Sequence, residues 1–452
     1  MTAARERSDP LPAGNFLDHS PRILYDEPAL MIQTLLQRTG RGALNYLAHL
    51  RAFSLNARLY LVNAVITGAS MGVFRFLLNF YVLSIGYNRE FVGNLVTASS
   101  LTALIVALPM GYLADRLGRK TSLVTGGTLT FLAVFAMVLW PERAVLISMN
   151  ILLGLAQSLA GVTMGPFLME NSSERERTYL FSYSSGLSTL SAFAGNWIGG
   201  TLPTWMGSLQ GVSATSSPAY AASLAVIAAG AALAVVPLLF MRMPRLERAE
   251  RAAFAPFAYV GQHAGQLSRL IAPMLMTSLG AGLIIPFMNI FFREVHHQSD
   301  ATIGAMFAWS SLAMGIGLMI APPLAERYGK IQLVVVTQML SIPFLILLGF
   351  APWFWISAGA YYIRAALMNL SGPVYQTFVM EKVDSTARAT VASLVSMAGN
   401  FGWAFSPTLS GWLQEQYGFA PAFIGTIALY SLSIFLYWRF FWPRQPKQPT
   451  GL

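Results

Sequence analysis

The chain has 452 residues, of which 55% are hydrophobic and 11% charged, and its mean hydropathy is +0.54. Soluble domains carry about 25% charged residues, so most of this chain cannot face water, and we expect a lipid bilayer as its principal partner. The absence of cysteine excludes disulfides and thiolate catalysis, and the net charge of +10 forms no basic face with stacking aromatics, so we expect no nucleic-acid partner.

Residues 1–57 are polar and charged, and no apolar core follows the basic start, so they are not a signal peptide. Leucines and arginines between Leu30 and Arg51 alternate in the pattern of an amphipathic helix. Two interpretations stay open, a helix on the inner membrane surface and a solvated extension. We predict a cytoplasmic N-terminal extension, partly an amphipathic helix.

From Arg58 onward the sequence predicts twelve apolar spans, each near the ~20 residues that cross a bilayer as a helix. Helices are expected because unpaired backbone amides in lipid cost several kcal/mol each. The spans are 58–83, 91–113, 121–140, 144–169, 179–205, 219–241, 269–293, 300–324, 332–351, 353–380, 389–414 and 419–441.

The charged linker 242–268 separates two six-helix bundles, predicted at 58–241 and 269–442, and 443–452 form a tail. All but five of the 29 Lys and Arg residues lie in the termini and in every second loop. The exceptions are Arg75 and Arg364 inside spans and Arg89, Arg143 and Arg293 near the opposite loops. This asymmetry places both termini in the cytoplasm. We expect a monomer in a bacterial plasma (inner) membrane.

A charged hairpin at 111–120 is repeated at 321–330. Asp115 pairs with Glu326, Gly118 with Gly329, and Arg119 with Lys330, each 211 positions apart (326 − 115). The same offset pairs Glu170 with Glu381. The sequence therefore predicts an all-α membrane protein with two homologous six-helix halves.

The run Gly111-x-x-x-Asp115-Arg116-x-Gly118-Arg119-Lys120, after the second span, resembles the best-known signature of the major facilitator superfamily (MFS) of secondary transporters. The resemblance covers about residues 58–442. It implies the MFS fold, two six-helix bundles that rock around a central cavity to give alternating access.

Two departures from the family pattern argue against proton-coupled drug export. Asn150 stands, four residues before Gly154, where a second signature has arginine. A third signature, Gly-Pro-x-x-Gly-Gly, appears without its proline as Gly195-Asn196-Trp197-Ile198-Gly199-Gly200.

The hairpin charges predict a cytoplasmic gate, in which the bases pair with acids that end spans four and ten. The alternative is a set of solvated helix ends, whose exposed pairs contribute only ~0–1 kcal/mol. The predicted gate residues are Gly111, Asp115, Arg116, Gly118, Arg119, Lys120, Glu170, Arg177, Glu326, Arg327, Gly329, Lys330, Glu381 and Arg388.

Arg75 and Arg364 are the charged residues at membrane depth, where an arginine costs at least ~2.5–3.5 kcal/mol, and no acid is available there to pair with them. We therefore predict that they face a cavity, with structural contacts to carbonyls as the alternative. Helical spacing and the family's cavity-lining spans give the predicted substrate-binding set, which is Arg75, Asn79, Asn150, Gln157, Asn289, Tyr361, Arg364 and Tyr375.

These features predict a secondary transporter of a small organic solute, with an anion as one hypothesis. The alternatives are a proton-coupled exporter of lipophilic compounds and, from another class, a non-transporting receptor or scaffold. Because no histidine or paired acids lie at membrane depth, we expect no enzyme activity, no cofactor and no metal site.

Overall fold

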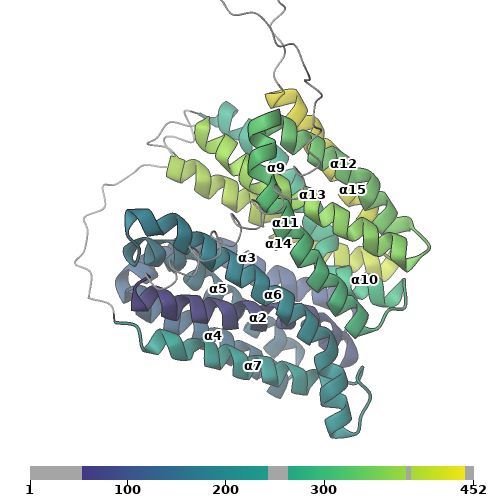
Figure 1. The fold of residues 1–452 in the computed structure, drawn as a ribbon. Coiled ribbons are helices and arrows are strands. Elements are labelled where there is room, and N and C mark those ends of the chain that lie inside the picture. The colour runs from purple at the N-terminus through teal and green to yellow at the C-terminus, as the bar shows by residue number, and fades with distance from the viewer. Residues whose placement is uncertain (1–52, 243–262, 383–387, 443–452) are drawn as a thin grey trace, which may run out of the picture. The chain divides into compact units, whose positions relative to one another are not determined.

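The computed structural model describes residues 53–242, 263–382 and 388–442, all helices and short connections (Figure 1). The predicted amphipathic helix, most of the linker and the whole tail lie outside these residues. The helices are α2 (Leu55–Ser84), α3 (Arg89–Leu117), α4 (Arg119–Leu139), α5 (Arg143–Glu170), α6 (Glu174–Gln210), α7 (Ser217–Leu239), α9 (Ala264–Ile284), the 3-10 turn η1 (Ile285–Phe287), α10 (Met288–Glu294), α11 (Asp300–Tyr328), α12 (Lys330–Phe350), α13 (Phe354–Glu381), α14 (Arg388–Tyr417) and α15 (Ala420–Phe441).

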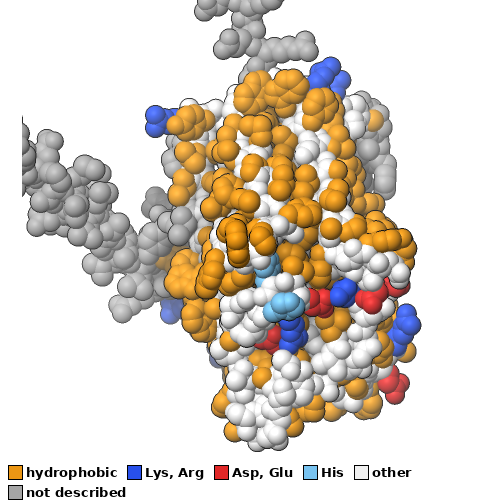
Figure 2. Space-filling model, turned by 90° about the vertical axis from the view of Figure 1, so that its right-hand side faces the viewer, with side chains coloured by type: hydrophobic (Ala, Val, Ile, Leu, Met, Phe, Trp, Pro, Cys, Tyr) orange, Lys and Arg blue, Asp and Glu red, His pale blue; other side chains and the backbone are white. Residues whose placement is uncertain are grey.

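Eight segments of the described chain are long and apolar enough to cross a membrane, with α9, η1 and α10 counted together. The remaining long helices, α6, α11, α13 and α14, have 28 to 37 residues and also exceed the ~20 needed. Figure 2 shows apolar side chains over most of one face, with charged residues at its upper edge and in a band across its lower half. The predicted layout of twelve spans in two bundles is confirmed.

The helix boundaries reproduce the internal repeat. Both ends of α3, α4 and α5 are separated from those of α11, α12 and α13 by 211 positions (300 − 89, 330 − 119 and 354 − 143). Asn88 and Ser299, also 211 apart, each cap the following helix by accepting a backbone N–H three residues later. Gly118 and Gly329 both turn the chain at positive φ, 83° and 92°, where a side chain would be strained.

Two predicted spans differ from the structure. Span seven is broken at η1, because Pro286 has no N–H to continue the helical ladder. Span five, expected at 179–205, extends as α6 from 174 to 210, because an apolar run marks only the part of a helix that lipid surrounds. The break in span seven becomes important at the contact between the bundles.

Helices α2–α7 form the N-terminal bundle and α9–α15 the C-terminal bundle. Because twelve spans cross the molecule, the start of α2 and the end of α15 lie on one face, here called the terminal face. The other face, where α3, α11, α13 and α15 begin, is the opposite face.

The bundles meet closely in the half of the molecule near the opposite face. A Cβ built on Gly93 of α3 would lie 2.2 Å from the Pro407 carbonyl oxygen of α14. A Cβ on Gly304 of α11 would lie 2.6 Å from Gly200 Cα of α6. Glycine at these seams lets the helix backbones touch, as small residues do generally in membrane proteins.

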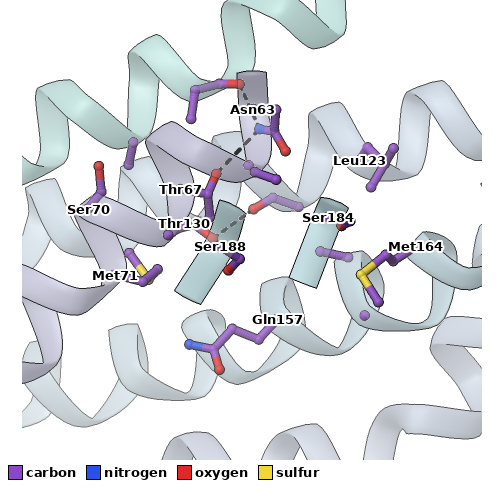
Figure 3. A pocket seen from close by; sticks show the side chains of 18 of the residues that line it. Asn63, Thr67, Ser70, Met71, Leu123, Thr130, Gln157, Met164, Ser184 and Ser188 are labelled. Carbon is purple, nitrogen blue, oxygen red and sulfur yellow. Dashed lines mark hydrogen bonds between the residues drawn. The ribbon is translucent and has the colours of Figure 1, made fainter. Parts of the chain in front are cut away.

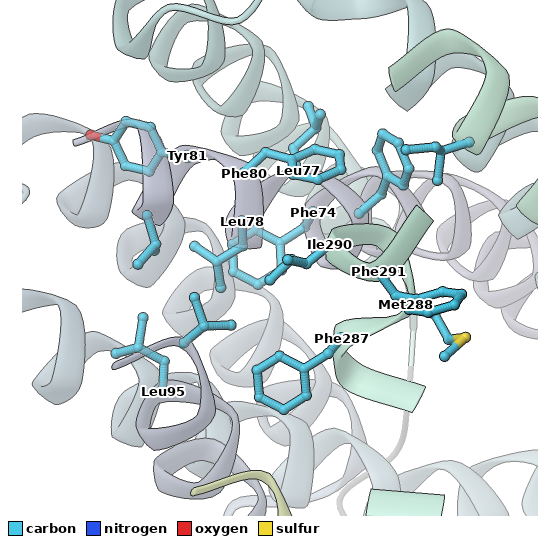
Figure 4. Packing of buried hydrophobic residues seen from close by; sticks show 14 of the residues in the cluster. Phe74, Leu77, Leu78, Phe80, Tyr81, Leu95, Phe287, Met288, Ile290 and Phe291 are labelled. Carbon is cyan, nitrogen blue, oxygen red and sulfur yellow. The ribbon is translucent and has the colours of Figure 1, made fainter. Parts of the chain in front are cut away.

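Polar and apolar contacts also join the bundles in this half. Asn79 Nδ2 donates to Asn289 Oδ1 (2.9 Å) and to the Pro286 carbonyl (2.7 Å), and Asn289 Nδ2 donates to the Phe76 carbonyl (2.8 Å). Arg89 forms an ion pair with Glu294 at 2.5 Å. Around the amides, buried apolar side chains of α2 pack against η1 and α10 (Figure 4). The opposite face is therefore closed in this conformation.

We expect Gly304→Ala to open the opposite face, because its Cβ meets backbone that cannot move aside. The reporter is one introduced cysteine, Thr97→Cys at the α3–α14 seam, in a chain that has no cysteine of its own. If the closed state is destabilised by ~1 kcal/mol relative to the open state, labelling by a membrane-impermeant maleimide rises about fivefold.

The matched control is Gly315→Ala on the same helix, where a Cβ meets no atom within 4 Å. Both variants gain the same helix propensity, so equal labelling in the two would show that the glycine seam does not hold this face closed.

Candidate functional site

A cavity of about 590 Å³ lies inside the N-terminal bundle, lined by α2, α4, α5, α6 and α7. It extends from near the terminal-face ends of these helices, at Tyr60, Leu123 and Leu238, to Arg75 deep in the molecule. Its polar lining residues are Asn63, Thr67, Ser70, Arg75, Thr130, Gln157, Ser184, Ser185, Ser188 and Thr189 (Figure 3).

Small residues provide both the room and the close packing around this cavity. A Cβ on Gly68 of α2 would lie 2.9 Å from the Ser188 carbonyl oxygen, and one on Gly126 of α4 would lie 3.2 Å from that of Ala156. Asn63 donates to the Ala234 carbonyl (2.7 Å) and to the Thr67 hydroxyl (3.3 Å), which ties α2 to α7 at the cavity wall. Thr130 and Thr189 donate to carbonyls of their own helices (2.9 Å each), and their oxygens can still accept a hydrogen bond from a solute.

Arg75 and Gln157 are the predicted substrate-binding residues that line the cavity, and both side chains are exposed. Arg75 is the one charged residue in the described lining, and no hydrogen bond or ion pair joins it to another described residue. Twenty positions separate it from Leu55, which places it about 30 Å along α2 (75 − 55). An unpaired guanidinium at this depth is suited to bind an anionic group.

The structure places the other six predicted substrate-binding residues outside this cavity. Asn79 and Asn289 join the bundles near the opposite face. Asn150 is buried between α5 and α4, and it donates to the Leu146 carbonyl of its own helix (2.8 Å). Tyr375 is buried and donates to the Leu270 carbonyl (2.6 Å).

Tyr361 and Arg364 lie within the C-terminal bundle. Tyr361 packs against Phe307 and Phe292 at ring-centroid distances of 5.6 and 6.0 Å. Arg364 is 4% exposed and donates to the Tyr430 hydroxyl (3.2 Å).

Sequence reasoning missed several lining hydroxyls and amides, including Thr130 and Ser188. A signal for some of them existed in span one, where Asn63, Thr67, Met71 and Arg75 recur every four residues and therefore share one helix face. The hydroxyls of α4 and α6 had no comparable signal, because isolated serines and threonines are common in membrane helices.

The charges on the terminal face form pairs within each bundle. Arg119 donates to Asp115 (2.8 Å) and to Glu170 (3.0 Å), and in the other bundle Lys330 pairs with Glu381. The two long-range pairs occupy repeat-equivalent positions (330 − 119 and 381 − 170 are both 211). Each pair ties the loop after a span to the end of the span two further along.

The other predicted gate residues lie around these pairs. Lys120 donates to the Leu239 carbonyl (2.7 Å), and no ion pair joins it to an acid whose side chain the structure describes. Arg116 and Arg327 lie over the rings of Tyr112 and Tyr328, at 5.9 and 5.3 Å. A Cβ on Gly111 meets no atom within 4 Å. The side chains of Arg177, Glu326 and Arg388 are outside the described set.

If these charges also act as a gate, Asp115 contacts the other bundle when the terminal face closes, in addition to its pair with Arg119 here. Asp115→Asn would then weaken that contact and favour the conformation seen here. The reporter is a cavity cysteine, Ser188→Cys, labelled from the terminal face. We expect its labelling to be about fivefold faster if the equilibrium between the two conformations shifts by ~1 kcal/mol. Glu142→Gln, which removes an acid from the opposite face, is the control. Unchanged labelling with Asp115→Asn would contradict the gate.

The arrangement of helices in this protein is similar to that in several solved structures. A crystal structure of a variant of the nucleoside transporter NupG has a TM-score of 0.70, with 15% identity, and the match covers 86% of this chain and all of that one. A bacterial homologue of the human lysosomal transporter Spinster, in an inward-facing unoccupied conformation, has a TM-score of 0.69 with 13% identity over 87% and 96% of the two chains. These likenesses show the fold.

A D-xylose–proton symporter also matches, with a TM-score of 0.64 and 14% identity over 85% of this chain and 97% of the other. Among curated proteins, a probable peptide/nitrate transporter of Arabidopsis thaliana is 25% identical over 146 residues, which are 31% of this chain. The match spans 30% of that protein's length.

The family model of the Major Facilitator Superfamily matches residues 60–271 and 270–451, which together include nearly all of both bundles. With the two repeated bundles and the matching solved structures, this shows that the chain belongs to the Major Facilitator Superfamily.

Proposed function

We propose that the protein is a secondary transporter that moves a small organic anion across the membrane by alternating access, with the anionic group bound at Arg75. The main support for this proposal is that the described lining of the cavity contains one unpaired guanidinium and no acid. A guanidinium that faces a cavity at this depth attracts an anion and repels a cation, and both effects are stronger than in bulk water. Hydroxyls and Gln157 suit the polar atoms of the same solute.

The closed opposite face supports a route for the solute. With the termini in the cytoplasm, as the charge distribution predicts, the terminal face is cytoplasmic and this conformation faces inward. Transport then requires the Asn79–Asn289 and Arg89–Glu294 contacts to part, while the bundles approach each other at the terminal face. The two bundles would rock against each other, as in related transporter folds.

Facilitated diffusion or anion exchange is the favoured mode of coupling. A proton-driven transporter needs a titrating group in its accessible site, usually a carboxylate or a histidine. The described lining of the cavity contains neither. This also disfavours the alternative of a proton-coupled exporter of lipophilic cations, for which a central arginine would be repulsive.

The test is a thermal-shift screen of the purified protein against organic anions, nitrate, sugars, amino acids and lipophilic cations. We expect anions to stabilise the protein, because a ligand that binds the folded state stabilises it by RT ln(1 + [L]/Kd). Arg75→Ala should weaken the binding of those anions about 10- to 100-fold, since a hydrogen bond to a charged group contributes about 1.5–3 kcal/mol.

Arg269→Ala serves as the matched control, because it removes an exposed arginine near the start of α9, outside the cavity lining. Anion binding that survives Arg75→Ala would move the site elsewhere. Selective stabilisation by lipophilic cations would instead support the exporter.

A further inference from the structure

A second arginine, Arg364, is buried inside the C-terminal bundle. It follows the start of α13 by ten residues, about 15 Å along the helix (364 − 354). Tyr430 follows the start of α15 by ten residues as well (430 − 420), and Ser310 that of α11 (310 − 300). Because all three helices begin at the opposite face, these side chains lie at similar depth.

The guanidinium of Arg364 is poorly satisfied. It donates one hydrogen bond, from Nη2 to the Tyr430 hydroxyl (3.2 Å), and lies 5.4 Å from the centroid of that ring. Its Nε is buried with no hydrogen-bond partner in the described chain. An arginine has five N–H donors and no acceptor, so most of its capacity is unused here.

The groups around Arg364 are neutral hydroxyls. Tyr361, one turn before Arg364, lies near both Arg364 and the buried hydroxyl of Ser310. Hydroxyls can donate and accept, but they carry no negative charge to offset the guanidinium. No described acid lies near this depth, since acids such as Asp300 and Glu381 stand at helix ends. The described ion pairs likewise leave Arg364 without a carboxylate.

The ring of Tyr430 packs against Gly280 of α9, a position that has no side chain. A Cβ on Gly280 of α9 would lie 2.7 Å from a ring carbon of Tyr430. The glycine therefore leaves the room that the phenol ring needs to lie beside the guanidinium. A buried positive charge whose neighbours are neutral hydroxyls lacks one component, an acceptor with negative charge.

We propose that Arg364 and Tyr430 form an anion-binding site inside the C-terminal bundle, which takes one small monovalent anionic group. That group is either a free halide ion or the carboxylate of a small solute. The site is separate from the cavity in the N-terminal bundle and does not depend on the function proposed for Arg75.

The experiment compares melting temperatures of the purified full-length protein in sodium methanesulfonate, sodium chloride and sodium acetate at equal ionic strength. Methanesulfonate, which is neither a halide nor a carboxylate, is the reference anion, chloride probes a halide site, and acetate probes a carboxylate site. An anion at a concentration of about ten times its Kd raises the melting temperature by about 2 °C.

The proposal expects this rise in wild type and in Arg75→Ala, and its loss in Arg364→Met. Tyr430→Phe, which keeps the ring and removes the hydroxyl, should reduce the rise and guards against misfolding of the arginine variant. A response to chloride identifies a halide, and a response to acetate alone identifies a carboxylate. The proposal is overturned if neither salt acts on wild type, or if the rise persists in Arg364→Met.

Discussion

The pair of amides that joins Asn79 to Asn289 is the contact on which the rest of this conformation depends. Both side chains are buried, and each reaches a backbone carbonyl of the other bundle. Buried amides without partners cost about 1–3 kcal/mol each, so this contact strongly favours bundles that touch here. The glycine seams and the Arg89–Glu294 pair extend the closure, and the cavity lies on the other side of it.

Much of the fold follows from the sequence because lipid leaves the backbone few choices. Apolar length gave the spans, and the offset between Asp115 and Glu326 gave a repeat that the helix boundaries reproduce. The pairs of Arg119 with Glu170 and of Lys330 with Glu381 could also be predicted, because opposite charges at neighbouring helix ends attract each other.

The site was less predictable, because periodicity identifies the face of a helix but not what that face meets. Arg75 and Asn79 share a face of α2, yet one is exposed in the cavity and the other contacts the partner bundle. Tyr375 lies eleven residues after Arg364 on the same face of α13 (375 − 364), but its hydroxyl reaches the Leu270 carbonyl inside the bundle. Which side chains line a cavity depends on helix rotation and bundle position, and both are properties of tertiary packing.

The break in span seven has a consequence for the energetics of opening. Within a continuous helix most carbonyls accept a hydrogen bond from their own helix, whereas the Pro286 carbonyl at the break accepts one from Asn79. When the bundles separate, this carbonyl and both asparagine amides must be hydrated. The entry of water at the opposite face is therefore part of the conformational change, because these three groups lose their protein partners there.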